Sequence, residues 1–176
     1  KQKGLIRRLA ATETLGGVTV ICTDKTGTLT LGKMEATMIL THEGLAKLDI
    51  CDPYNLSKAQ KMSVHIGMLS TDAYAENPDA SFEEIVVRGN LTEQALLRLG
   101  ARCGLNQYEL SQKEPLIDSL LFSSERKYSA SLRRVDEKDA LYVLGAPEMV
   151  LNKVSLFLDK NGEEVSILSN SEFKEL

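Results

Sequence analysis

The sequence predicts a mixed α/β chain in which helices flank an antiparallel sheet. Three observations lead to this class. The β-branched apolar run Val18–Thr23 stops abruptly at a polar loop, residues 56–70 place apolar side chains at helical spacing, and strand pairs with short turns follow residue 116. At 176 residues the chain can bury a core of its own, and its length fits one domain plus part of another.

Composition argues against several classes of function. The net charge of -4, the pI of about 5.3 and the scattering of both charge signs argue against nucleic acid as a partner. The three cysteines are widely spaced and form no CxxC pair, which argues against a disulfide framework or a zinc site and favours reduced thiols. The longest apolar stretches, Val18–Cys22 and Leu116–Phe122, are shorter than the roughly 20 residues that span a bilayer. We therefore expect no membrane crossing and no secretory leader in this chain.

The run Val18–Thr23 has the composition of a buried strand in a parallel sheet, and such strands carry chemistry at their carboxyl ends, where Asp24 stands. A carboxylate attacks a phosphoryl group only when the repulsion between the two anions is neutralised, a task for Lys25 and a metal ion. The loop also offers the hydroxyls of Thr26 and Thr28, with a glycine between them that permits a tight turn. The plain alternative is an ordinary strand-to-turn junction.

The next stretch supplies elements of a second domain. Alternation along Lys33–Leu40 predicts a half-buried strand whose inward side chains are Met34, Ala36, Met38 and Leu40. Turn formers in residues 42–55 predict a loop, and residues 71–84 predict another. Between them, helical spacing predicts a helix over 56–70 with one face made of Leu56, Ala59, Met62, Ser63, Ile66 and Leu69.

A second helix is predicted from its cap. Asn90 or Thr92 can cap a helix that runs to Gly104, which puts Glu93 in the first turn. An acid in that turn complements the helix dipole, so a purely structural role is the plain interpretation of Glu93.

A β-hairpin is predicted where two apolar stretches, residues 116–122 and 128–135, flank the polar turn 123–126. Phe122 and Lys127 differ by an odd number of positions, so a straight strand would place them on opposite faces. A bend at the turn would let both side chains line one pocket.

The last part of the chain predicts a strand at 141–144, a short helix opened by Pro147, and a hairpin around the Asn-Gly pair at 161–162. Between the strand and the helix, Gly145 can let the backbone approach a ligand closely. The plain alternative for Gly145 is a strand-to-helix corner.

The loop Asp24–Thr30 resembles, over its whole length, the phosphorylation motif of P-type cation-transport ATPases. The resemblance implies that Asp24 forms an aspartyl-phosphate. We accordingly assign Asp24, Lys25, Thr26 and Thr28 to catalysis, and the metal contacts of Mg2+ to Asp24 and Thr26.

Three later segments resemble the nucleotide-domain motifs of the same family. The stretch ending at Glu93 is similar to a Gly-Asp-Pro-Thr-Glu motif whose glutamate lies at the adenine site, although the Asp and Pro are replaced here. The segment Phe122–Lys127 is similar to one whose Phe stacks on adenine and whose Lys approaches the phosphates. Gly145–Glu148 matches a Lys-Gly-Ala-Pro-Glu motif, except that Leu144 stands in place of the lysine.

The resemblance implies a fold, a function and a parent protein. Residues 1–32 would be the first strand and aspartyl-phosphate loop of a haloacid-dehalogenase-like phosphorylation domain, and residues 33–176 an inserted nucleotide-binding domain, incomplete at its C-terminus. ATP and Mg2+ would be the cofactors, and Glu93, Phe122, Lys127 and Gly145 would bind the nucleotide. The chain would be a cytoplasmic portion of an integral membrane pump that also has transmembrane and actuator domains.

Three further expectations concern the transported ion, the activity of this chain and the class of protein. Calcium is our interpretation for the transported cation. We expect no self-phosphorylation of Asp24 in this chain, since further metal-binding acids have no identifiable motif in it. The alternatives are a soluble haloacid-dehalogenase-type phosphatase or phosphotransferase, and a nucleotide-binding module without catalysis.

Overall fold

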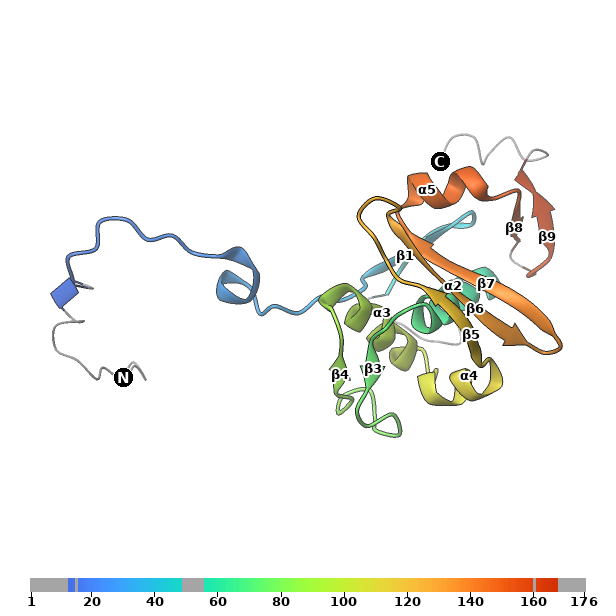
Figure 1. Cartoon of the computed structure of the whole chain (residues 1–176), viewed down its shortest axis with the longest axis horizontal. Helices are drawn as coiled ribbons and strands as arrows, with labels where there is room; N and C mark the ends of the chain where they lie inside the picture. Colours follow the sequence, from blue (N-terminus) through green and yellow to red (C-terminus); the bar gives the residue numbers. More distant parts are fainter. Residues whose placement is uncertain (1–12, 15, 49–55, 160, 168–176) are drawn as a thin grey trace. The chain divides into compact units, whose positions relative to one another are not determined.

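The computed structural model describes residues 13–14, 16–48, 56–159 and 161–167. These residues belong to two compact units, 1–33 and 34–176, which are described separately. Figure 1 shows that most helices and strands belong to the second unit.

In the first unit, the run Val18–Thr23 does not form the buried strand that its composition predicts. Residues 18–24 have no regular secondary structure, and Val18, Val20 and Ile21 are 45%, 74% and 84% exposed. A strand is stable only when neighbouring strands satisfy its backbone and cover its side chains, and no strand in the described part of the chain pairs with this segment. The loop after it forms one wide turn, η1 (Lys25–Leu29).

The second unit mixes helices with antiparallel strands, so the predicted mixed class is confirmed (Figure 1). Its helical elements are α2 (Lys58–Leu69), α3 (Leu91–Arg102), α4 (Gln107–Lys113), α5 (Pro147–Val150) and η3 (Leu151–Lys153). Its strands are β1 (Met38–Thr41), β2 (Gly44–Lys47), β3 (Tyr74–Ala75), β4 (Val87–Arg88), β5 (Leu116–Leu120), β6 (Tyr128–Val135), β7 (Lys138–Gly145), β8 (Leu156–Leu158) and β9 (Glu164–Ser166).

The central sheet has the order β5-β6-β7, and all neighbouring strands run antiparallel. The pairs β1-β2, β3-β4 and β8-β9 form separate two-stranded sheets. The predicted hairpins at 116–135 and around residues 161–162 are therefore confirmed. Helix α2 packs against both α3 and β7 and joins the helical layer to the sheet.

Two apolar clusters form the core, and both draw side chains from α2 and α3. One contains Met68 and Leu97 together with Ala73, Ile85 and Val87, and the other contains Val64 and Leu99 together with Ile39 and Leu48. Because both clusters take side chains from α2 and α3, these two helices are the framework on which the other elements pack.

The helix predicted over 56–70 is confirmed as α2, but its predicted buried face is only partly right. Met62 is 42% exposed, whereas Gln60, Val64 and Met68 are buried. The reason is that α2 contacts α3, α4, β1 and β7 and so buries a wide arc instead of a single stripe.

The strand predicted over Lys33–Leu40 is shorter in the structure, and the opposite set of alternate residues faces inward. In β1, Ile39 is buried, while Met38 and Leu40 on the predicted inward face are exposed. Ile39 packs with Leu48 and Val64, and this contact decides which face turns inward because successive strand residues point to opposite sides.

The expectations of no membrane-spanning helix and no disulfide framework can be examined only in the described residues. Among the described residues, none of the helices combines the length and the apolar character needed to cross a bilayer. Cys22 and Cys103 are not in disulfide bonds, and Cys51 lies outside the described residues.

Candidate functional site

A pocket of about 840 Å³ in the second unit brings together the residues that the sequence assigned to nucleotide binding. Glu93, Phe122, Lys127 and Gly145 all line it, and so does Leu144. The remaining lining residues are Met34, Asn90, Leu91, Thr92, Leu96, Ser129 and Ala146. The pocket is mostly apolar and lies within the size range of small-molecule sites.

The first turn of α3 forms one wall of the pocket. The side chain of Asn90 accepts a hydrogen bond from the backbone N–H of Glu93 at 3.0 Å, so Asn90 is the cap and Glu93 lies in the first turn. The predicted cap is thereby confirmed. Gly89 precedes it with φ of 130°, and a Cβ on Gly89 would lie 2.8 Å from the Cβ of Ala73, so only glycine fits there.

The turn between β5 and β6 forms the second wall. Lys127 has a left-handed φ of 57°, and its N–H donates to the carbonyl of Ser123 at 2.7 Å. This bend brings Phe122 and Lys127 to the same pocket, as the sequence predicted, and Phe122 remains 61% exposed. A large aromatic face open to a cavity is suited to stacking on a planar ligand.

The end of β7 forms the third wall, and here the reason for a glycine differs from the prediction. A Cβ on Gly145 would overlap the Cβ of Tyr128 and lie 2.6 Å from the carbonyl oxygen of Lys127. Gly145 is thus required because the neighbouring strand β6 approaches it, which is a packing reason. Leu144 pairs with Ser129 across the two strands, and both side chains line the pocket.

An ion pair that the sequence did not indicate lies beside the pocket. The Nζ of Lys127 is 3.7 Å from a carboxylate oxygen of Glu148, in the first turn of α5. The motif that contains Glu148 does not reveal this pairing, because it depends on the register of β6 and β7 and the two residues are far apart in sequence.

The predicted catalytic loop belongs to the first unit and is exposed throughout. The carboxylate of Asp24 accepts a hydrogen bond from the N–H of Lys25 at 2.7 Å, and the N–H of Thr30 donates to the carbonyl of Lys25 at 3.1 Å. Gly27 has φ of 80°, a left-handed conformation that favours glycine, so the predicted tight turn is present. The chemical roles of Asp24, Lys25, Thr26 and Thr28 stay predictions.

The residues assigned to Mg2+ have the oxygen ligands that this ion prefers, but there are only two of them, Asp24 and Thr26. Asp24 and Thr26 offer oxygen donors, and Mg2+ is commonly bound by one or two carboxylates plus substrate phosphates and water. Within the described ranges, no group of three or more His, Cys, Asp or Glu side chains could hold a metal ion. The donor set therefore fits a metal that is shared with a phosphate ligand.

The comparison with known proteins confirms the resemblance to P-type ATPases. The profile of the family described as "P-type ATPase, cytoplasmic domain N" matches residues 60–174. The chain belongs to this family.

Curated relatives of this N domain are transport ATPases. The chain is 32% identical to plasma membrane-type calcium-transporting ATPase 9 of Arabidopsis thaliana, over 97% of the chain and 16% of that protein. It is 37% identical to the probable cation-transporting ATPase F of Mycobacterium bovis, over 86% of the chain and 18% of that protein. It is 34% identical to a calcium-transporting ATPase of Listeria monocytogenes, over 93% of the chain and 18% of that protein. The chain thus spans less than a fifth of the length of these relatives.

A polar cluster under the sheet was also missed by the sequence analysis. The hydroxyl of Tyr142 donates to a carboxylate oxygen of Glu114 at 2.8 Å, and the Nε2 of His65 lies 3.0 Å from the same oxygen. Arg133 donates to the carbonyls of Glu114 and Leu69, each at 2.8 Å. Burial, together with the hydrogen bond to Glu114, raises the pKa of Tyr142. The cluster ties α2 and the end of α4 to β6 and β7.

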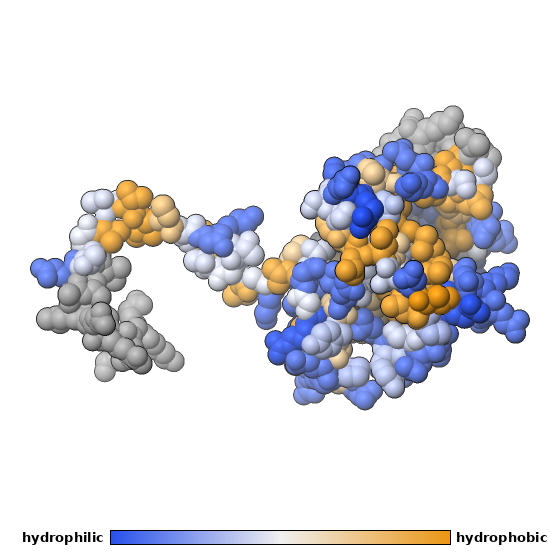
Figure 2. Space-filling view, viewed as in Figure 1, coloured by the Kyte–Doolittle hydropathy of each residue, from blue (hydrophilic) through white to orange (hydrophobic). Residues whose placement is uncertain are grey.

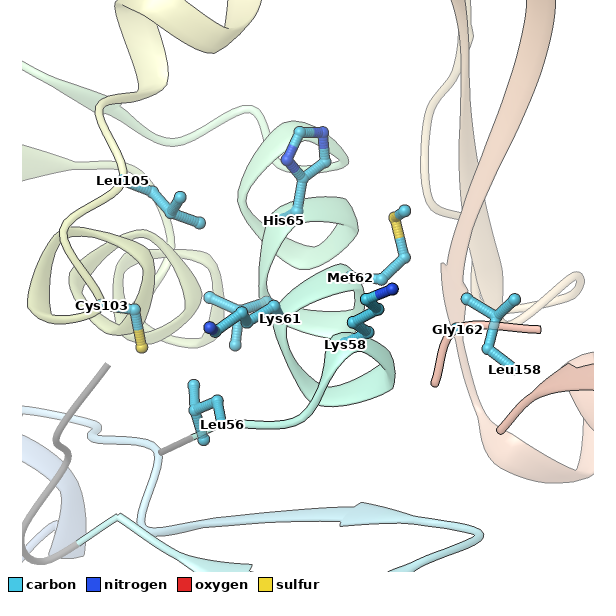
Figure 3. A pocket seen from close by; sticks show the side chains of 10 residues that line it. Leu56, Lys58, Lys61, Met62, His65, Cys103, Leu105, Leu158 and Gly162 are labelled. Carbon is cyan, nitrogen blue, oxygen red and sulfur yellow. The ribbon is translucent and has the colours of Figure 1, made fainter. Parts of the chain in front are cut away.

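A second cavity of this N domain, of about 380 Å³, contains none of the predicted site residues (Figure 3). Lys58 and Met62 of α2 point toward Leu158 and Gly162 of the β8-β9 hairpin, and Cys103 and Leu105 lie on the other side of α2 (Figure 3). Its lining combines apolar groups with Lys58, Lys61 and His65.

Proposed function

We propose that the pocket of this N domain binds ATP and presents it for phosphoryl transfer within a P-type cation-transporting ATPase. The observation that carries the proposal is the meeting of three separate motifs, represented by Glu93, Phe122 and Gly145, at one pocket. Membership in the N-domain family supports the same function.

Each pocket residue has a role suited to its chemistry. Phe122 would stack on the adenine ring, Glu93 would accept a hydrogen bond from the adenine amino group, and Lys127 would approach the phosphates. Gly145 would line the pocket through its backbone, because its neighbour on β6 leaves no room for a side chain. The apolar lining, including Leu144, would exclude water from the base.

The loop at Asp24 would supply the nucleophile. In the parent protein, the carboxylate of Asp24 would attack the γ-phosphorus of ATP, forming an aspartyl-phosphate and releasing ADP. Lys25 would reduce the repulsion between the carboxylate and the phosphate, and Thr26 and Thr28 would position it. Bound Mg2+, held by Asp24 and Thr26, would neutralise further negative charge.

The parent would be a membrane pump, with this chain as a cytoplasmic portion. Residues 1–32 would begin a haloacid-dehalogenase-like phosphorylation domain into which residues 33–176 are inserted. The partners would be the transmembrane and actuator domains of the same parent and the transported cation. Two of the relatives described above carry names that specify calcium, which favours calcium as that cation.

Nucleotide titration of Phe122→Ala tests the pocket. Base stacking on an aromatic side chain contributes about 1 to 3 kcal/mol, so this variant should bind ATP about fivefold or more weakly by calorimetry. Tyr74→Ala is the matched control, because Tyr74 is an exposed aromatic residue of β3 that does not line the pocket. Equal ATP affinity in all three proteins would contradict the proposed site.

A phosphorylation assay tests the role of Asp24. In the parent protein, Asp24→Asn should abolish the acid-stable, hydroxylamine-sensitive label formed from radioactive ATP, while ATP binding persists. Labelling that survives this substitution would exclude Asp24 as the phosphorylated residue.

A further inference from the structure

We infer that Glu148 is a specificity-determining residue of the pocket, which pairs with Lys127 and thereby makes binding nearly indifferent to the length of the phosphate chain. The inference rests on the proposed nucleotide binding and adds to it a preference among ligands: the nucleoside is recognised, and the phosphates contribute little.

The charges around the pocket are the first step. Among the residues that line it in the described part of the chain, Glu93 is the one acid and Lys127 the one cation, so the lining has no net charge. With the carboxylate of Glu148 3.7 Å from the ammonium of Lys127, the surroundings become net negative. A chain of phosphates therefore meets no excess of positive charge at this site.

The backbone holds Lys127 and Glu148 near each other. The N–H of Ala146 donates to the carbonyl of Lys127 at 2.9 Å, and Tyr128 pairs with Gly145 across the two strands. Gly145 allows this approach because it has no Cβ to overlap Tyr128. Glu148 follows Ala146 by two positions, so its side chain is placed beside Lys127 by the fold itself.

The ion pair is accessible, which sets the size of its effect. The side chains of Lys127 and Glu148 are 55% and 63% exposed, so solvent and salt screen their attraction. Exposed pairs of this kind change equilibria by about two- to fivefold. A phosphate that approaches Lys127 must share the ammonium group with Glu148 or displace the Glu148 carboxylate. The same carboxylate also repels the phosphate.

The experiment is a calorimetric titration of adenosine, AMP, ADP and ATP against the full chain and its Glu148→Gln variant. For the wild type we expect the four dissociation constants to agree within about threefold. For Glu148→Gln we expect ATP to bind about two- to fivefold more tightly, while adenosine binds as before.

Two further variants isolate the cause. Glu137→Gln removes the same charge from the turn between β6 and β7, away from the pocket, and should leave all four affinities unchanged. The double variant Lys127→Gln/Glu148→Gln should lose the gain for ATP, because the freed ammonium is then absent.

The outcomes separate this inference from the proposed function. Wild-type affinity for ATP at least tenfold above that for adenosine would overturn the inference and leave the nucleotide pocket standing. The inference would also be overturned if Glu148→Gln did not bind ATP more tightly than the wild type, or if its affinity for adenosine rose equally. A double variant Lys127→Gln/Glu148→Gln that kept the higher affinity for ATP would overturn it too. If neither adenosine nor ATP binds the wild type, both the proposed function and the inference are wrong.

Discussion

At Gly145, a single missing methyl group allows two strands to approach each other. Gly145→Ala would force the new Cβ against Tyr128 and the Lys127 carbonyl, so we expect the free energy of unfolding to fall by about 1 to 3 kcal/mol. Urea denaturation measures this loss. Gly67→Ala is the control, because a Cβ at that position in α2 would meet its nearest neighbour, Leu96, at an ordinary 3.6 Å. That change should stabilise the chain by about 0.5 to 1 kcal/mol. If Gly145→Ala left the free energy of unfolding unchanged, β6 and β7 would be able to move apart at no cost.

Leu144 puts an apolar branched side chain in a pocket that we propose for a polyanion. A lysine there would add a charge-assisted hydrogen bond worth roughly 1.5 to 3 kcal/mol, so Leu144→Lys should bind ATP about tenfold to a hundredfold more tightly. Titration with ATP and adenosine measures the gain, which should be confined to ATP.

The control for Leu144→Lys lies on the same strand. Leu141→Lys adds the same charge to an exposed β7 residue that does not line the pocket, and it should leave the affinity unchanged. If Leu144→Lys gains no affinity for ATP and Phe122→Ala loses none, the assignment of this pocket is wrong.

At the scale of elements, the polar cluster around Glu114 joins two helices to the sheet and makes their packing depend on pH. The folded chain raises the pKa of Tyr142 above its ordinary value of 10, mainly through burial and then through the hydrogen bond to Glu114. A group whose pKa is raised on folding contributes stability that is fully present below its unfolded pKa. That stability is lost as the pH rises through the folded pKa.

Tyr142→Phe should therefore flatten the loss of stability above about pH 10. At neutral pH the variant should be less stable by about 0.5 to 1.5 kcal/mol, because Glu114 loses a hydrogen bond. Urea unfolding at a series of pH values measures both effects. Tyr108→Phe, at an exposed residue of α4, should reproduce the wild-type curve. Parallel wild-type and Tyr142→Phe curves between about pH 9 and 11 would exclude Tyr142 as the titrating group.

The elements that could be predicted are those whose ends carry a local chemical signal. Ser57 and Asn90 both cap helices through bonds to nearby N–H groups, and the polar turns at 123–126 and 161–162 close hairpins. Helix α4 was missed because it is short and has no clear apolar period, although Asn106 caps it. The inward face of β1 was wrong because packing on Leu48 and Val64, which alternation alone does not reveal, decides it.

At the scale of the whole molecule, the pocket residues that belong to local sequence motifs could be predicted. The contacts that depend on the register between strands could not. Glu93 and Phe122 stand next to a helix cap and a turn, so local chemistry indicates where they lie. The partners Glu148 of Lys127 and Glu114 of Tyr142 depend on how β6 and β7 align and on where α4 ends. Such pairings join distant positions, and no short motif encodes them. Figure 2 shows apolar side chains on one face of the second unit, and the exposed apolar residues of the sheet include Leu120 and Leu141.

The contrast between the two compact units gives a final prediction about where stability resides. Val20 in the first unit is 74% exposed, whereas Val64 of α2 is 4% exposed and packs with Ile39 and Leu99. Val64→Ala should lower the free energy of unfolding by about 1 to 3 kcal/mol, because it leaves a cavity in the core. Val20→Ala should change it by less than about 0.5 kcal/mol.

Hydrogen exchange on the unaltered chain checks the same contrast. The amides of residues 18–22 make no ladder hydrogen bonds in the described structure and should exchange within the earliest time points. Amides of α2 and α3, which carry both core clusters, should be the slowest. Protection of Val18–Cys22 equal to that of these helices would mean that this run forms a paired strand in solution.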